Sequence, residues 1–212
     1  MSAIGEPADV AARLAAAVDG ADGPGETVVT GSDAGGTVCL DVHHDAWHPA
    51  LVAARHALGL DVFDWLSAVD QLDADPPGLD VVTHLVSSAA ADPGRGLVRV
   101  LLRTRVPASA LSVDSATDVW PGAAWHERET HEMFGLAFAG FDDGTGRGLR
   151  PLLLPDGFEG TPLRKSFVLA ARASKAWPGA KEPGESDAHA SPSRRKMLPP
   201  GVPDPSWGPR DA

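Results

Sequence analysis

The segment from Leu97 to Val106 alternates in side-chain character with the two-residue period of a β-strand. One side carries Val98, Val100, Leu102, Thr104 and Val106, and the other carries Arg99, Arg103 and Arg105 with Leu101 among them. This pattern is typical of a strand with one face in the core and the other in water or against an interface. The chain is therefore expected to build a sheet whose apolar face must be covered.

Two segments have the periodicity of amphipathic helices. Residues 7–19 place apolar side chains on one side, with Pro7 near the start, and residues 45–58 do the same more clearly. Asp45 is expected to cap the second helix and Gly59 to end it. These two helices can supply the cover for the sheet.

Further strands are expected on either side of the second helix. Residues 28–30 and 37–42 alternate like the arms of a hairpin, and residues 79–87 form a strand after the Pro-Pro-Gly turn at 76–78. Helices and strands in this order predict an α+β fold. We expect a mixed, mainly antiparallel sheet with the helices packed on one face.

The last part of the chain differs in composition from the rest. Residues 172–212 contain eight prolines and four glycines and few apolar side chains, so we expect an extended Pro-rich tail after a single α+β domain at residues 1–171. The tail is either disordered or ordered along a partner. Met197, Leu198 and Trp207 favour the second alternative, because such side chains gain from burial.

Composition excludes several classes of function. The formal charge of −11 disfavours non-specific binding to nucleic acid. Cys39 is the single cysteine, so this chain alone cannot form a disulfide or hold a Cys-ligated iron–sulfur cluster or a Cys-based zinc site. No run approaches the ~20 apolar residues of a membrane span, and the first ten residues do not resemble a secretory leader.

One short helix, predicted at residues 123–133, has an unusual density of charge. Within six positions it carries Glu127, Arg128, Glu129, His131 and Glu132. Arg128 is thereby expected to lie among three carboxylates, because residues three and four apart share a helix face. Its large apolar neighbours Trp125, Met133 and Phe134 are expected to be buried.

Three interpretations of this helix are open. A metal site fits poorly, because His126 and His131 are five positions apart and so point about 140° away from each other. General acid–base catalysis by paired carboxylates is a second interpretation, but nothing in the sequence indicates a nucleophile or a pocket beside them. We favour a structural ionic network in which Arg128 satisfies carboxylates withdrawn from water, inside the chain or at an interface.

The region after the helix is expected to be irregular. Gly135 has the place of a helix-ending glycine, residues 142–148 form a Gly-rich surface turn without the features of a phosphate loop, and residues 155–157 form another turn. Arg164 and Lys165 follow in an extended stretch. They form either an exposed basic pair on a loop, or a site at which one of the two cations pairs with a carboxylate of the helix or of a partner subunit.

The two motifs ERETHEMFG (127–135) and LRPLLLPDGFEGTPLRKS (149–166) resemble the C subunit of the proton-pumping NADH:quinone oxidoreductase, bacterial respiratory complex I. The residues that fit its signature are Glu127, Arg128, Glu129, Met133, Phe134 and Gly135, and then Gly160, Pro162, Leu163, Arg164 and Lys165. Glu132 stands where Asp is usual, and Ser166 stands where Asp is common. The resemblance makes these residues structural and interface positions, with no catalytic, cofactor-binding or metal-binding residue in the chain.

The resemblance also implies a setting. The family's C subunit is a cofactor-free scaffold of the hydrophilic arm, peripheral on the cytoplasmic side of the cell membrane and attached only through the complex. It packs against the D subunit and near the cluster-bearing B and I subunits, while electrons pass from NADH through FMN and iron–sulfur clusters in partner subunits to quinone. The equivalent subunit of a membrane-bound hydrogenase or of a deazaflavin-dependent quinone reductase is an alternative. A stand-alone metallohydrolase using His126, Glu127 and His131 is a third hypothesis, from another class.

Overall fold

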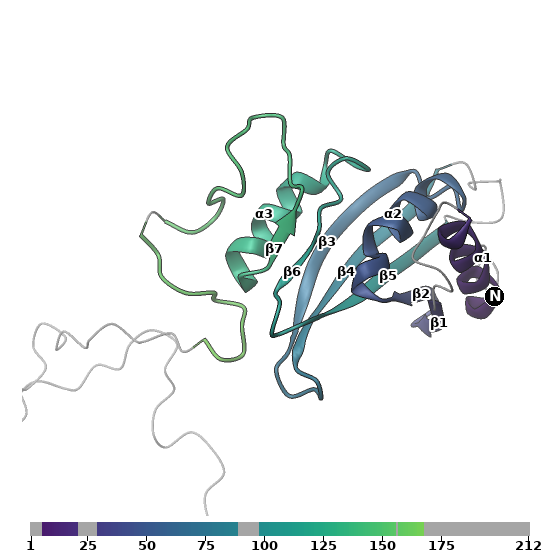
Figure 1. Ribbon diagram of the computed structural model, residues 1–212, viewed down its shortest axis with the longest axis horizontal. Helices are drawn as coiled ribbons and strands as arrows, with labels where there is room; N and C mark the ends of the chain where they lie inside the picture. Colours follow the sequence, from purple (N-terminus) through teal and green to yellow (C-terminus); the bar gives the residue numbers. More distant parts are fainter. Residues whose placement is uncertain (1–5, 21–28, 89–97, 156, 168–212) are drawn as a thin grey trace, which may run out of the picture. The chain divides into compact units, whose positions relative to one another are not determined.

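The computed structural model describes residues 6–20, 29–88, 98–155 and 157–167 (Figure 1). The Pro-rich tail expected at 172–212 lies outside the described residues.

A five-stranded sheet forms the centre of the fold, with strand order β1-β2-β5-β4-β3 (Figure 1). The strands are β1 (Val29–Ala34), β2 (Thr37–Val42), β3 (Val62–Gln71), β4 (Gly78–Ser87) and β5 (Val98–Pro107). Strand β2 pairs with β5 in parallel, and every other pair in this sheet is antiparallel. The α+β fold with a mixed, mainly antiparallel sheet is therefore confirmed.

Helices cover one face of this sheet. Helix α1 (Pro7–Asp19) and helix α2 (Trp47–His56) lie across it, and helix α3 (Ala123–Phe134) packs against β3 (Figure 1). A small parallel pair, β6 (Ser112–Asp114) with β7 (Ala137–Ala139), flanks α3. Within the described part of the chain, no helix has both the length and the apolar character needed to cross a membrane.

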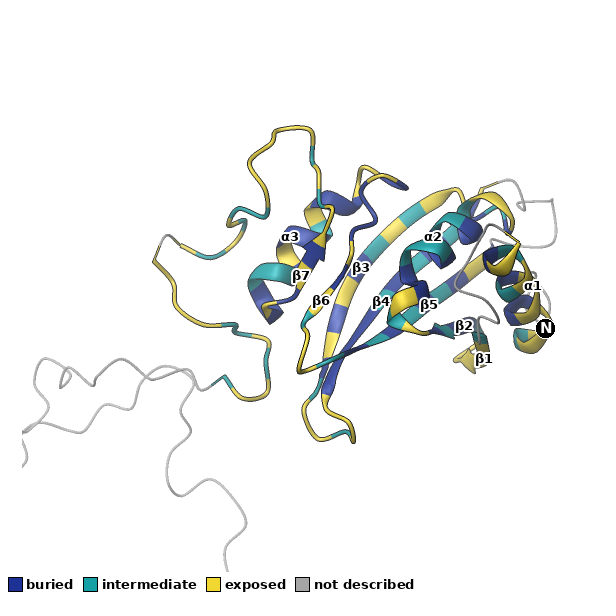
Figure 2. Ribbon diagram, viewed as in Figure 1, coloured by how far each residue is buried: buried dark blue, intermediate teal, exposed yellow. Residues whose placement is uncertain are grey.

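The core lies between the sheet and these helices. Along β5 every second residue from Val98 to Val106 is buried, as the alternation predicts (Figure 2). On the opposite face, Arg103 pairs with Asp41 of β2 and Arg105 with Asp80 of β4. Two of the three arginines on that face are thus paired with carboxylates of neighbouring strands.

The second helix begins later than expected. Asp45 is not its cap: residues His44–Ala46 form a short 3₁₀ turn, η1, and α2 starts at Trp47 without a side-chain cap. The carboxylate of Asp45 lies against the rings of His43 and His44 instead. The helix ends at His56, and Gly59 follows with a positive φ of 71°.

Candidate functional site

The charged helix α3 uses Glu127 to fix the chain that leads into it. Glu127 has no exposed surface, and its two oxygens accept hydrogen bonds from Ser115 Oγ and from the Ala116 amide, both at 2.6 Å. Burial raises the pKa of Glu127 to about 7, although both hydrogen bonds act in the opposite direction. This carboxylate thereby ties α3 to the segment after β6.

Arg128 binds main-chain carbonyls rather than the expected carboxylates. Its Nε donates to the carbonyl oxygen of Arg150 at 3.1 Å, and its Nη2 donates to that of Pro151 at 2.8 Å. None of the salt bridges within the described residues includes Arg128. Within the described residues Arg128 forms no salt bridge with the three carboxylates, because Glu127 turns inward, Glu129 is exposed and Glu132 accepts hydrogen bonds from loop amides. An ionic network at an interface stays a prediction.

Trp125 also differs from the expectation. Its side chain is 62% exposed, whereas Met133 and Phe134 are buried as predicted. The guanidinium of Arg128 lies over the indole ring, 5.2 Å from its centroid, which is a cation–π contact. Trp125 therefore lies on the outer surface of α3, on the side where Arg128 reaches the neighbouring loop.

Glu132 holds the backbone of the Leu-rich loop. Its carboxylate accepts hydrogen bonds from the amides of Leu152, Leu153 and Leu154 at 3.2, 2.8 and 2.8 Å. Burial acts to raise the pKa of Glu132, but these amides and the nearby Arg128 outweigh it and lower the pKa below its usual value. Glu132 and Arg128 thus bind the same loop, one through its amides and the other through its carbonyls.

The second motif folds back onto the first. The Leu163 amide donates to the carbonyl of Met133 at 3.1 Å, near the end of α3. Gly135 ends the helix in the left-handed region with φ 74°, as predicted, and a Cβ there would lie 3.2 Å from Thr161 Cγ2. Gly160 has φ 107° and lies against the ring of Phe167. Gly135 therefore allows the two motifs to approach closely, whereas Gly160 makes room for Phe167 of its own segment.

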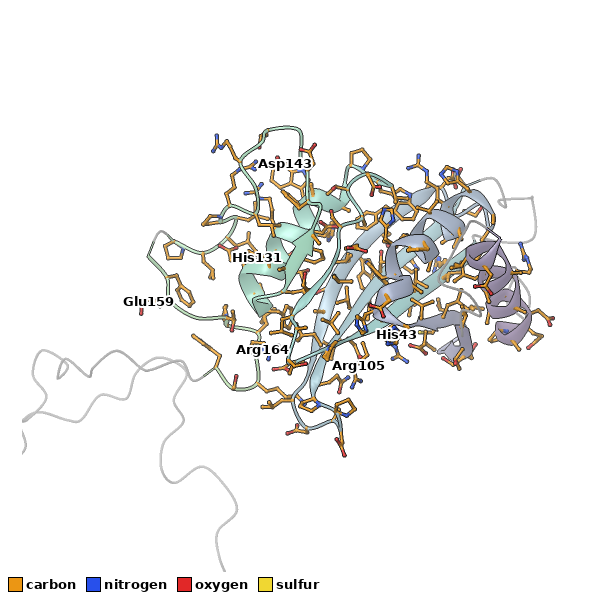
Figure 3. All side chains as sticks on the ribbon, in the orientation of Figure 1. His43, Arg105, His131, Asp143, Glu159 and Arg164 are labelled. Atoms are coloured by element: carbon orange, nitrogen blue, oxygen red, sulfur yellow. The ribbon has the colours of Figure 1, made fainter. Side chains whose placement is uncertain are left out.

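Arg164 and Lys165 pair with β3 and the turn after it. Asp70 Oδ2 accepts a hydrogen bond from the Lys165 amide at 2.7 Å and lies 3.5 Å from Arg164 Nε. Figure 3 labels Arg164. The Lys165 ammonium pairs with Asp73 at 3.0 Å. The expected pairing with a carboxylate of the helix is therefore wrong: the intrachain partners lie at the end of β3 and just beyond it.

Sequence reasoning missed Asp70, although a signal for it exists. Asp70 follows Leu66 and Ala68 at two-residue spacing, so it occupies an inward-facing strand position, and it is only 5% exposed. An acidic residue at such a position requires partners. Arg150 was also missed: it pairs with Asp143 of the Gly-rich loop and supplies a carbonyl to Arg128.

The three residues of the metallohydrolase hypothesis do not converge. His131 Nδ1 lies 2.7 Å from the Leu136 carbonyl, which requires it to donate a hydrogen bond there. The ring of His126 packs edge-on against Phe63 with centroids 5.3 Å apart, and Glu127 binds the segment after β6. Because their contacts lie in different places, this arrangement does not form a set of metal ligands.

Residues 40–173 match the protein family described as the 30 kDa subunit of respiratory-chain NADH dehydrogenase. The chain belongs to this family. The match spans both motifs and confirms the resemblance found in the sequence.

Curated relatives carry the corresponding name. The NADH-quinone oxidoreductase C subunit of Roseiflexus castenholzii is 41% identical over 106 residues, which cover 50% of this chain and 54% of the relative. The C 2 subunit of the same enzyme from Rhizobium etli is 40% identical over 124 residues, covering 57% of this chain and 60% of the relative. The matched part thus spans little more than half of these relatives.

A solved structure shares the fold. It belongs to the membrane-bound sulfane sulfur reductase, an archaeal respiratory membrane complex. The similarity covers 77% of this chain and 91% of that chain, with a TM-score of 0.55 and 20% sequence identity. At this identity the comparison concerns the fold alone.

Proposed function

We propose that this chain is a cofactor-free scaffold subunit of the hydrophilic arm of a proton-translocating NADH:quinone oxidoreductase. Family membership supports the assignment to this type of complex. The observation that carries the scaffold role is the use made of the signature side chains: Arg128 and Glu132 bind the backbone of a single loop of their own chain. Their charged groups thereby fix the shape of this loop.

The surface formed by α3 and the two motifs exposes large apolar side chains, as a surface that contacts another protein does. Trp125 is 62% exposed, Leu153 60% and Leu163 54%, and all three belong to segments that the signature residues fix. Large apolar side chains, aromatic ones above all, contribute strongly to binding when a partner covers them. We infer that a neighbouring subunit packs on this surface.

The setting of the protein follows from the same proposal. Its partners are the equivalents of the D, B and I subunits, and it lies on the cytoplasmic side of the cell membrane, attached through the complex. FMN and the iron–sulfur clusters belong to partner subunits. Cys39 is the single cysteine of this chain, and an iron–sulfur cluster needs four ligands. This agrees with the assignment of the clusters to partner subunits.

A second candidate is the equivalent subunit of a related complex, such as a membrane-bound hydrogenase or a deazaflavin-dependent quinone reductase. The shared fold with a chain of the archaeal sulfane sulfur reductase favours keeping this alternative, because the same fold occurs in a complex with another name. The subunits that accompany the chain distinguish the two candidates.

Co-purification from the native membranes tests the proposal. A tagged full-length chain is extracted in mild detergent, and the accompanying proteins are identified and assayed for NADH:quinone reductase activity. We expect a stoichiometric set that includes flavin- and cluster-bearing subunits and oxidises NADH. A hydrogenase or a deazaflavin-dependent set would establish the second candidate, and recovery of the chain without partners would contradict both.

A further inference from the structure

A cluster of potential metal ligands lies far in sequence from both motifs, at the turn η1 between β2 and α2. The rings of His43 and His44 lie against each other with centroids 4.2 Å apart. The carboxylate of Asp45 turns one oxygen to each ring: Oδ2 lies 3.3 Å from His43 Nδ1, and Oδ1 lies 3.3 Å from His44 Nε2. In the described ranges, no other three His, Cys, Asp or Glu residues bring their ligand atoms within 4.8 Å of one another.

The hydrogen bonding of His43 makes its Nδ1 an acceptor. The Asp45 amide lies 3.4 Å from this atom and can only donate to it, so Nδ1 carries a lone pair and the ring proton is on Nε2. The same Nδ1 faces Asp45 Oδ2, which is also an acceptor. Because Nδ1 has a single lone pair, a cation bound between Nδ1 and Oδ2 would take the place of the long contact with the Asp45 amide.

The distances from the two rings to the two oxygens of Asp45 leave room for a small metal ion. A tetrahedral zinc site has Zn–N and Zn–O bonds of about 2.0–2.2 Å, which separates neighbouring ligand atoms by about 3.3–3.5 Å. Both nitrogen–oxygen separations at this turn are 3.3 Å. We propose that His43, His44 and Asp45 form a surface site for a divalent transition-metal ion of the Zn²⁺ type.

The donor set and the exposure define the kind of site. Two imidazoles and one carboxylate suit Zn²⁺, Ni²⁺ or Cu²⁺, whereas Mg²⁺ and Ca²⁺ prefer oxygen ligands throughout. The side chains of His43 and Asp45 are 65% and 72% exposed, so solvent completes the coordination and the ion exchanges readily. The nearby His48 takes no part, because its Nε2 pairs with Asp118 at 2.8 Å.

This inference is independent of the proposed function. It departs from the expectation that the chain holds no metal, which rests on the family resemblance, on the spacing of His126 and His131 and on the single cysteine. An exchangeable surface ion of this kind is not a resident redox cofactor.

Calorimetric titration of the full-length chain with Zn²⁺ tests the site. The protein carries no histidine tag and is treated with a chelator before the titration. We expect one equivalent of Zn²⁺ to bind at this site. His43→Ala and His44→Ala should each weaken that binding by at least about tenfold, the loss typical even of groups that only orient a ligand.

The matched control is His56→Ala, which removes another exposed imidazole at the end of α2 and should leave the affinity unchanged. Circular dichroism establishes that each variant is folded. Co²⁺ added in place of Zn²⁺ should give a visible spectrum that the double variant His43→Ala/His44→Ala lacks. Equal binding by wild type and double variant, equal affinity for Mg²⁺, or no Zn²⁺ uptake by the wild type would each overturn the site.

Discussion

In the sheet, each strand finds hydrogen-bond partners for its backbone on the neighbouring strand, and α1 and α2 bury its apolar face. Between residues 140 and 167 the described backbone forms no helix or strand. There, backbone groups bind charged side chains of α3 and β3: Arg128, Glu132 and Asp70. Where the chain is irregular, a few charged side chains thus supply the backbone hydrogen bonds that a neighbouring strand supplies in the sheet.

The two regions should therefore respond differently to substitution. In the sheet region the loss of an apolar side chain opens a cavity, whose cost depends on the buried volume. In the irregular region the loss of one charged side chain leaves several backbone groups without partners. Five experiments, four on stability and one on hydrogen exchange, test this difference.

The largest effect is expected at Trp47, which is fully buried between α2 and the sheet. Trp47→Ala should lower the free energy of unfolding by about 4 kcal/mol, because it removes a large apolar side chain from the core. Urea unfolding measures the change. Trp125→Ala is the matched control and should cost less than about 0.5 kcal/mol, since Trp125 is 62% exposed. Similar costs for the two tryptophans would contradict the assigned core.

The next effect is expected at the buried pair Asp70–Arg164. Arg164→Met should cost about 3 kcal/mol, because it leaves the carboxylate of Asp70 buried without its cation. Asp70 Oδ1 and Arg164 Nη1 already lack partners, so the pair depends on its remaining contacts. A double-mutant cycle with Asp70→Asn should show favourable coupling. Additive costs of the two substitutions would show that the pair does not hold the second motif on β3.

Glu127 provides a pH-dependent test. Its pKa rises from 4.5 to about 7 on folding, mainly through burial, so the folded chain keeps a proton that the unfolded chain releases. Stability is therefore greatest below the unfolded pKa and falls as the pH rises through 7, by about 2 kcal/mol between about pH 5 and 8. Glu127→Gln, which stays neutral, should reduce this decline. Parallel pH profiles of wild type and variant, measured by urea unfolding, would be the opposite result.

A smaller effect on stability is expected at Arg128. Arg128→Met removes two hydrogen bonds to carbonyls that solvent can partly rehydrate, and should cost about 1 kcal/mol. Assembly in the native membranes, followed by native gel electrophoresis, should suffer more than the stability of the isolated chain. Arg13→Met on α1 is the control, because Arg13 is exposed and lies outside the segment that matches the family. Normal assembly of the Arg128 variant would remove its proposed role.

The fold could be predicted where one period dominates a segment. The alternation of β5 and the apolar side of α1 correspond directly to buried faces. Strand β3 was not predicted, because Asp64, Ser67 and Asp70 interrupt its apolar pattern. Two of these polar residues find partners only through tertiary contacts: Asp64 binds His84, and Asp70 binds the second motif.

The sequence predicted where the candidate site lies in the chain, but not which groups its side chains hydrogen-bond. The sequence identified α3 and its glycine end, since Gly135 ends α3 as expected, but it missed the contribution of Arg150 within the second motif. The acceptors of Arg128 could not be found, because the carbonyls of Arg150 and Pro151 have no signature in the sequence: every residue has a carbonyl. The sequence therefore predicted carboxylates as the partners of Arg128. Its actual partners are backbone carbonyls that come close only once the loop is folded.

Hydrogen exchange at the amides of Leu152, Leu153 and Leu154 tests most directly whether Glu132 holds the irregular loop. We expect these amides to be protected in the wild-type chain and to lose that protection in Glu132→Gln, while the amides of β5 keep theirs. Exchange of these three amides in the wild type as fast as that of Gly146 and Gly148 in the exposed Gly-rich loop would show that Glu132 does not hold it.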